Sequence, residues 1–130
     1  MRVDLEHMVH VVDDDEAVRD SVRSLLESHG LAVRDYASAR AFLSADGSAA
    51  GCLLLDLHMP GMSGLELLEN LRSAEEAIPT IIMTGRSDAG LKARAVRLGV
   101  LAFLDKPVDE DELLGTISQA FDAIDSRIGS

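Results

Sequence analysis

The chain has 130 residues, of which 47% are hydrophobic and 27% are charged, so it is long enough for one domain with a sizeable core. Its formal net charge of -11 argues against direct binding of nucleic acid or anionic membrane and favours cations or basic protein surfaces. The single cysteine, Cys52, excludes an internal disulfide bond, which fits a reducing compartment, and we expect the cytoplasm. No apolar run approaches the about 18 residues of a membrane span, and the N-terminus lacks a signal-peptide core.

Short apolar runs alternate with longer amphipathic stretches along the chain. Residues 8–12 are apolar except for His10 and are followed by three acids, which predicts a buried strand. Val18, Val22 and Leu26 then recur at helical spacing. Gly30 predicts the end of that helix. The later expected elements are a strand over 31–36, a short helix capped by Ser38, a loop over 47–51, a strand over 52–56, a helix capped by Ser63, a strand over 80–83, a helix over 89–98, a strand over 100–104 and a last helix carrying Leu113 to Ile124.

Five strands that each precede a helix indicate crossover connections and a parallel sheet. The strands are nearly uniformly apolar, which is typical of a sheet covered by helices on both faces. We therefore predict an α/β fold: a doubly wound, five-stranded parallel sheet with five helices in a three-layer sandwich. Residues 1–125 are expected to form the domain, and 126–130 a tail or the beginning of a linker.

Polar residues stand where the predicted strands end. Asp13 and Asp14 follow the first strand, Asp56 ends the third, Thr84 follows the fourth and Lys106 follows the fifth. Because the carboxyl ends of parallel strands share one edge, where open α/β sheets bind ligands, these side chains are expected to meet there.

The chemistry of such a group of side chains favours phosphoryl transfer. Three close carboxylates repel one another, and a hard divalent cation such as Mg²⁺ relieves that repulsion. A carboxylate can attack phosphorus, and the phosphoryl oxygens then need neutralising or hydrogen-bonding groups such as an ammonium, a hydroxyl and backbone N–H groups.

The chain resembles the receiver domains of bacterial two-component response regulators, over roughly residues 9–121. The motifs that carry the resemblance are Val11-Val12-Asp13-Asp14, Asp56-Leu57-His58-Met59-Pro60-Gly61-Met62-Ser63-Gly64, Met83-Thr84-Gly85 and Phe103-Leu104-Asp105-Lys106-Pro107. Thr84-Gly85 and the last motif are similar to the FixJ/NarL-like branch. No main motif position departs from the family pattern. The resemblance implies the flavodoxin-like strand order 2-1-3-4-5.

The resemblance also implies roles for the acidic residues. Asp56 would be the phosphoacceptor. Asp13, Asp14, Asp56 and the backbone carbonyl of His58 would hold Mg²⁺, for which Mn²⁺ could substitute. The domain would not be an enzyme beyond Mg²⁺-dependent phosphorylation and dephosphorylation of itself.

The remaining roles implied by the resemblance concern switching. Thr84 and Lys106 would bind the phosphoryl group, and Phe103 would turn inward behind Thr84. The Lys106–Pro107 peptide bond would be cis. The donor would be a sensor histidine kinase, and the output would be transcription through a DNA-binding domain outside this chain. We expect phosphorylation to favour a homodimer through the helix over 89–98, the fifth strand and the last helix, with no nucleic acid or membrane bound by this domain.

Each residue taken singly also has an ordinary structural interpretation. Asp13 and Asp14 could be helix-capping acids, as we expect of Asp15 and Glu16. The other structural interpretations are a turn residue for Asp56, a turn hydroxyl for Thr84, a surface lysine for Lys106, a core aromatic for Phe103, an exposed loop histidine for His58 and a small buried hydrophobe for Cys52.

Three other functions fit parts of the pattern less well. A haloacid-dehalogenase-like phosphatase needs an acid two residues after its nucleophile, where this chain has His58. A nucleotide or flavin binder needs a glycine-rich loop where this chain has Asp13, Asp14 and Asp15. A degenerate receiver that acts only as an interaction module would not need the intact set of polar residues.

Overall fold

The computed structural model describes residues 7–45, 50–74, 77–85 and 89–128, and the side chains of 127 and 128 lie outside the description. Its strands are β1 (Val9–Val12), β2 (Val33–Tyr36), β3 (Cys52–Asp56), β4 (Thr80–Thr84) and β5 (Ala102–Asp105). Its helices are α1 (Glu16–Ser28), α2 (Ala39–Ser44), α3 (Gly64–Ser73), α4 (Ala89–Arg97) and α5 (Glu110–Ile128). No helix within these ranges is long and apolar enough to cross a membrane.

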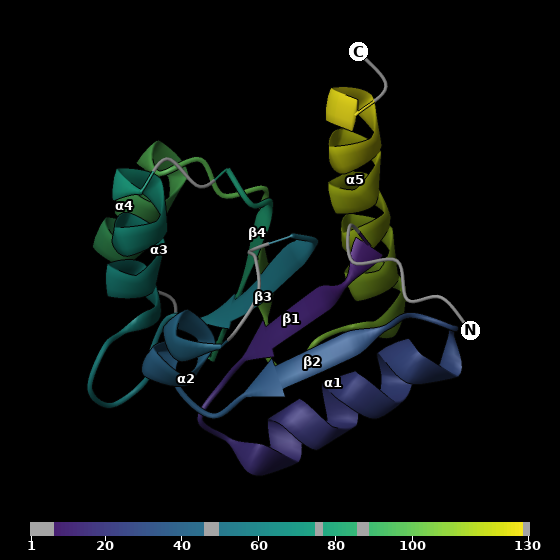
Figure 1. Cartoon of the computed structure of the whole chain (residues 1–130). Helices are drawn as coiled ribbons and strands as arrows, with labels where there is room; N and C mark the ends of the chain where they lie inside the picture. Colours follow the sequence, from purple (N-terminus) through teal and green to yellow (C-terminus); the bar gives the residue numbers. More distant parts are fainter. Residues whose placement is uncertain (1–6, 46–49, 75–76, 86–88, 129–130) are drawn as a thin grey trace.

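The strands form one parallel sheet in the order β2-β1-β3-β4-β5, which confirms the predicted topology. Helices α1 and α5 cover one face of the sheet, and α2, α3 and α4 cover the other (Figure 1). The molecule is therefore the predicted three-layer sandwich, and all carboxyl ends of the strands lie at one edge.

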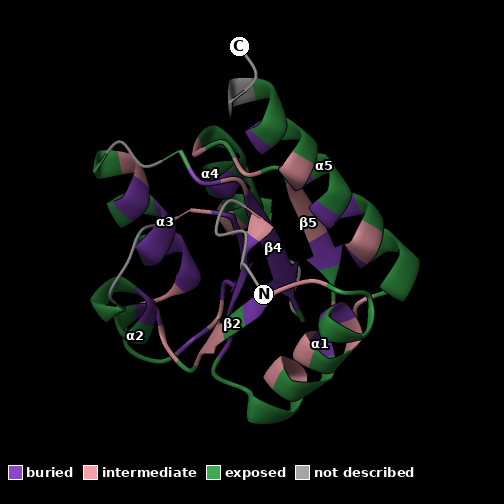
Figure 2. Ribbon diagram, turned by 45° about the vertical axis from the view of Figure 1, so that its right-hand side comes forward, coloured by how far each residue is buried: buried purple, intermediate pink, exposed green. Residues whose placement is uncertain are grey.

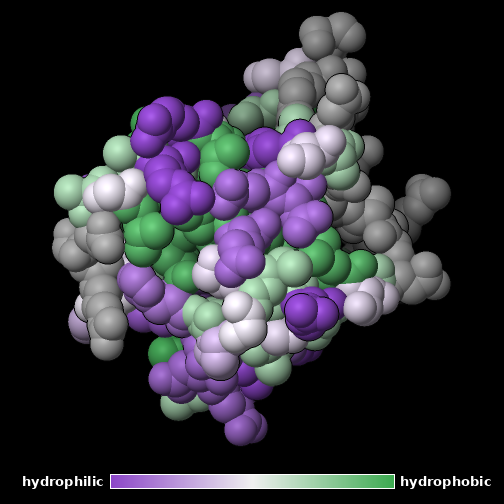
Figure 3. All heavy atoms as spheres, turned by 90° about the vertical axis from the view of Figure 1, so that its left-hand side faces the viewer, coloured by the Kyte–Doolittle hydropathy of each residue, from purple (hydrophilic) through white to green (hydrophobic). Residues whose placement is uncertain are grey.

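Each face of the sheet carries its own hydrophobic core. Side chains that alternate along β3 divide between the two cores: Leu53 and Leu55 face α2, α3 and α4, whereas Cys52 and Leu54 face α1 and α5. The central strands are buried throughout, as Figure 2 shows in purple, and the helices expose their outer sides. Figure 3 views the side of α2, α3 and α4, where hydrophobic areas lie between hydrophilic ones.

Local sequence signals account for the helix starts. The Asp15 carboxylate accepts hydrogen bonds from the Ala17 and Val18 N–H groups, which confirms its capping role. Ser38 caps α2 as expected. Ser63 caps α3 through a reciprocal pair of hydrogen bonds with Glu66.

The structure corrects several expected boundaries. Strand β2 begins at Val33 and β5 begins at Ala102, and both are only partly buried because they lie at the edges of the sheet. Residues 126–128, expected to be a tail, continue helix α5, although the end of the domain itself remains a prediction. Most of the expected loop over 47–51 lies outside the described residues.

Candidate functional site

The carboxyl edge of the sheet brings together the polar residues that the sequence singled out. Asp13 is fully buried just after β1, Asp56 ends β3 and is 5% exposed, and Thr84 ends β4 and is 8% exposed. Lys106 follows β5, and its N–H donates to the Thr84 carbonyl over 2.9 Å. Four segments far apart in the sequence thus converge, as predicted.

The carboxylate of Asp13 is fixed at both oxygens. Oδ1 accepts the N–H of Asp15 over 2.9 Å, and Oδ2 accepts the ammonium of Lys106 over 2.7 Å. These hydrogen bonds offset the cost of burying the carboxylate. The Lys106–Pro107 peptide bond is cis, as the resemblance implied.

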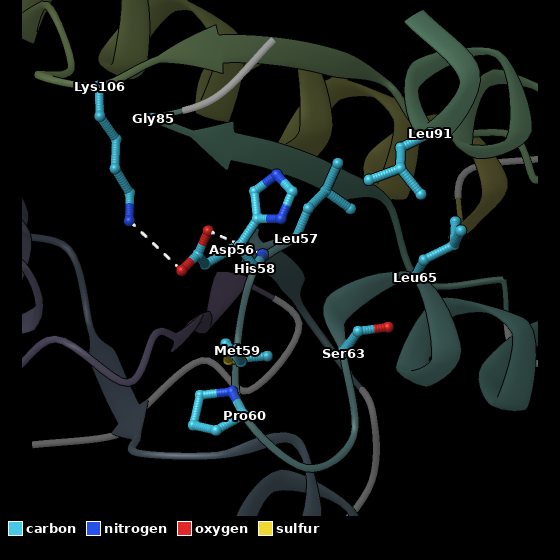
Figure 4. Close-up of a pocket in the computed structure, with 10 residues that line it drawn as sticks. All are labelled: Asp56, Leu57, His58, Met59, Pro60, Ser63, Leu65, Gly85, Leu91 and Lys106. Carbon is cyan, nitrogen blue, oxygen red and sulfur yellow. Dashed lines mark hydrogen bonds and ion pairs between the residues drawn. The ribbon is translucent and has the colours of Figure 1, made fainter. Parts of the chain in front are cut away.

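Asp56 lies within reach of the same lysine. Lys106 Nζ is 3.5 Å from Asp56 Oδ2, and the N–H of His58 donates to Asp56 Oδ1 over 3.2 Å (Figure 4). Burial raises the pKa of the Asp56 carboxyl above its ordinary value; the charge of Lys106 opposes this rise and the charge of Asp13 adds to it. Burial is therefore the main influence on the pKa of Asp56, and the charges of Lys106 and Asp13 modify it in opposite directions.

The charge of Lys106 is itself stabilised by the site. Burial lowers the pKa of Lys106, but the hydrogen bond to Asp13 and the charge of Asp56 outweigh that effect, so its pKa is raised overall. The ammonium lies between the carboxylates of Asp13 and Asp56, and both favour its charged form.

Three carboxylates form a group suited to a metal ion. Carboxylate oxygens of Asp13, Asp14 and Asp56 all lie within 4.8 Å of one another, and Asp14 is exposed. An all-oxygen, anionic donor set that is open on one side matches a hard cation that retains waters. These residues therefore fit the expected Mg²⁺, and they can hold a metal ion of that kind.

A cleft of about 600 Å³ opens beside Asp56 and Lys106. Residues 57–60 form one wall, and Leu65 of α3 and Leu91 of α4 approach from the other elements (Figure 4). Its polar end at Asp56 gives an incoming group access to the carboxylate.

Gly64 allows α3 to begin directly against the site. A Cβ on this residue would lie 2.1 Å from the backbone oxygen of Asp56 and 2.9 Å from the Leu57 Cα. The N–H of Gly64 donates to the Leu57 carbonyl over 3.2 Å. The glycine within the sequence motif is therefore required by a close backbone approach.

Two expected residues differ from their simplest interpretations. Phe103 is half-buried rather than fully in the core, and Lys92 Nζ of α4 lies 5.2 Å from its ring centroid. His58 is half-buried rather than exposed, and its Nε2 is buried without a hydrogen-bond partner. The position of a loop histidine depends on neighbouring loops, which sequence spacing does not reveal.

Sequence reasoning missed two residues beneath the acidic loop, which consists of residues 13–15. Arg19 Nη1 donates to the Asp13 carbonyl over 2.8 Å, and Asp35 of β2 lies 3.5 Å from Arg19 Nε. An arginine on an exposed-looking helix position and an acid in an edge strand carry no motif, so only the packing of α1 against β2 identifies them.

Comparison with known proteins gives one consistent relationship. Residues 9–118 match the sequence profile of the response regulator receiver domain. The transcriptional regulatory protein FixJ of Azorhizobium caulinodans is 46% identical over 110 residues, which are 84% of this chain and 52% of that protein. The response regulator protein TodT of Pseudomonas putida is 41% identical over 118 residues, covering 90% of this chain and 52% of the relative.

Solved structures agree with this relationship. The crystal structure of FixJ-N has a TM-score of 0.82 and 39% identity, covering 89% of this chain and 94% of that one. The response regulator StyR has a TM-score of 0.86 and 40% identity, covering 94% of this chain and 62% of that one. The chain spans about half the length of the curated relatives described above.

Proposed function

Because the chain belongs to the receiver-domain family of response regulators, we propose that it accepts a phosphoryl group on the Asp56 carboxylate. The observation that carries this proposal is the position of Asp56 at the polar end of an open cleft, 3.5 Å from the ammonium of Lys106 and within an acidic group suited to a metal ion. A nucleophile, a cation and a metal-binding donor set are the components that phosphoryl transfer requires.

The reaction is a displacement at phosphorus. An oxygen of Asp56 forms a bond to phosphorus while the bond from phosphorus to the donor breaks, and the departing electron pair remains with the donor. With a histidine kinase as donor, the broken bond is the P–N bond of a phosphohistidine and the leaving group is its imidazole, which takes up a proton. Lys106 then pairs with one phosphoryl oxygen, and the Thr84 hydroxyl binds another.

Asp13, Asp14 and Asp56, with the backbone carbonyl of His58, would hold Mg²⁺ at this site, and Mn²⁺ could take its place. When bound, the cation neutralises charge on the phosphoryl oxygens. The donor set supports this assignment because it consists of closely spaced carboxylate oxygens.

The proposed consequence is a change on the face formed by α4, β5 and α5. Movement of Thr84 toward the phosphoryl group lets Phe103 turn inward, away from Lys92. Helix α4 suits such a change because Ala95 is its one buried residue. Val96 is 58% exposed and Leu101 is 39% exposed near this face, which supports the formation of a homodimer there after phosphorylation.

The cellular role follows from the relatives. A sensor histidine kinase is the proposed donor, and the cytoplasm is the proposed location. Transcription is the proposed output, because the FixJ relative is named a transcriptional regulatory protein. This role needs a DNA-binding domain in addition to the residues described here.

The direct test is intact-protein mass spectrometry after incubation with acetyl phosphate and Mg²⁺. We expect a gain of one phosphoryl group that requires Mg²⁺ and is lost in Asp56→Asn. Asp105→Asn is the matched control because Asp105 is an exposed acid at the same sheet edge. The Asp105→Asn variant should still be phosphorylated on Asp56 to the same extent as the wild-type protein. A folded wild-type protein that gains no mass would instead indicate an interaction module.

A further inference from the structure

The backbone carbonyl of Asp13 stands at a transition in the chain. The N–H of Asp13 makes the last bond of the β1–β2 ladder, to the Tyr36 carbonyl over 3.2 Å. Beyond it the chain turns into α1, so the Asp13 carbonyl has no strand partner. Arg19 supplies one, because its Nη1 donates to that oxygen over 2.8 Å. A buried carbonyl requires a partner of this kind.

Arg19 is in turn oriented by strand β2. Its Nε lies 3.5 Å from Asp35 Oδ2, and the two side chains are 14% and 23% exposed. Guanidinium nitrogens are held in a rigid plane, so anchoring Nε on Asp35 fixes the direction of Nη1. The resulting chain of contacts runs from β2 through Arg19 to the backbone of the acidic loop.

Arg23 provides an internal comparison on the same helix. Its Nη1 lies 2.9 Å from Asp35 Oδ1 and its Nε lies 3.3 Å from Glu27. Arg19 and Arg23 therefore share Asp35 as a partner. Arg19 additionally donates a hydrogen bond to the Asp13 carbonyl.

We propose that Arg19, oriented by Asp35, is a positioning residue for the metal site. It holds the backbone of Asp13 so that the carboxylates of Asp13 and Asp14 converge with that of Asp56. This inference rests on the proposed metal-dependent function. Groups that orient metal ligands through hydrogen bonds influence affinity strongly, even though they do not touch the metal.

Whether replacing Arg19 weakens or strengthens metal binding separates a positioning role from a purely electrostatic one. Removing a cation near three carboxylates should, by charge alone, strengthen the binding of a divalent cation. Loss of positioning should weaken it. The variant Arg19→Lys sharpens this contrast, because it keeps the charge but cannot span both the Asp13 carbonyl and Asp35 with a rigid fork.

The experiment measures the Mn²⁺ dissociation constant by electron paramagnetic resonance, with circular dichroism to establish that each variant is folded. We expect Arg19→Met and Arg19→Lys to bind Mn²⁺ roughly tenfold more weakly than the wild-type chain. The matched controls Arg23→Met and Arg23→Lys should bind equally or more tightly. In the metal-free proteins, the amide resonances of residues 13–15 should shift in the Arg19 variants and remain in place in the Arg23 variants.

The outcomes distinguish the two proposals. Wild-type protein that binds no Mn²⁺ would contradict the metal-dependent function itself. Wild-type protein that binds Mn²⁺ while the folded Arg19 variants bind it equally well, or while the Arg23 variants weaken it as much, would overturn the positioning role. If Arg19→Met does not fold, the charge-conserving Arg19→Lys decides the result alone.

Discussion

The ammonium of Lys106 lies closer to Asp13 than to Asp56: its Nζ is 2.7 Å from Asp13 Oδ2 and 3.5 Å from Asp56 Oδ2. The proposed phosphoacceptor therefore shares its cation with a proposed metal ligand. In this arrangement Lys106 competes with a metal ion for the charge of Asp13 and is also within reach of a group placed on Asp56.

Replacing Lys106 should separate metal affinity from phosphorylation. In Lys106→Met we expect Mn²⁺ to bind roughly threefold to tenfold more tightly, because the competing cation is gone. Phosphorylation by acetyl phosphate should nevertheless slow, because the phosphoryl oxygens lose their ammonium partner. Electron paramagnetic resonance measures the first effect and mass spectrometry the second. Arg97→Met, which removes an exposed cation from α4 without touching the proposed switch, serves as the control. Weaker Mn²⁺ binding in Lys106→Met would contradict the competition.

Gly64→Ala should disturb the site and destabilise the fold. The new Cβ would meet the backbone oxygen of Asp56 at 2.1 Å, so we expect the free energy of unfolding to fall by about 2 kcal/mol or more. Gly115→Ala is the matched control, because its Cβ would meet nothing within 4 Å. In helix α5 that change should stabilise the protein by about 0.5–1 kcal/mol. Urea unfolding measures both, and equal effects of the two substitutions would refute the close-contact explanation.

Buried His10 should make stability fall at mildly acidic pH. His10 Nε2 lies 2.8 Å from the Ala50 carbonyl oxygen and Nδ1 lies 3.0 Å from the Tyr36 hydroxyl, an arrangement that fits a neutral ring. Burial lowers the pKa of His10 below 6.5 in the folded protein. The unfolded chain therefore binds a proton first as the pH falls, so stability is complete above about pH 6.5 and declines below it.

The variant His10→Gln tests this pH dependence. The same carboxylates titrate in both proteins, so the difference between wild type and variant isolates the histidine. We expect the urea midpoint of the variant to change less between pH 7.5 and pH 5.5, values placed on either side of the ordinary histidine pKa of about 6.5. His29→Gln is the control, because exposed His29 pairs with Glu110 at the surface. An identical slope in His10→Gln and wild type would contradict the prediction.

Cys52 should be unreactive in the native protein. The thiol is fully buried on β3, and burial raises its pKa to about 12. The thiolate is the reactive form, so a disulfide reagent such as Ellman's reagent should modify native protein only through unfolding. We expect one thiol per chain to react rapidly in denaturant and slowly without it. Rapid modification of folded protein would show that β3 opens locally.

The fold followed from sequence because its signals are local and repeated. Apolar runs such as residues 52–55, each followed by turn residues and then by an amphipathic stretch, predicted five strands and their parallel arrangement. The edge strands were predicted less well, since β2 and β5 are short and only partly buried. Strand boundaries at an edge depend on which neighbours are present, and a single sequence does not contain that information.

The sequence by itself determined which chemical groups meet at the carboxyl edge, because parallel strands bring Asp13, Asp56 and Lys106 to one side whatever the details of packing. Only the tertiary structure decided which of those groups contact one another and which other residues support them. The contact of Lys106 with Asp13, the support of the Asp13 backbone by Arg19 and the burial of His58 Nε2 are set by distances between separate elements. Such distances arise from side-chain packing across the sheet and its helices, and spacing along the chain does not encode them.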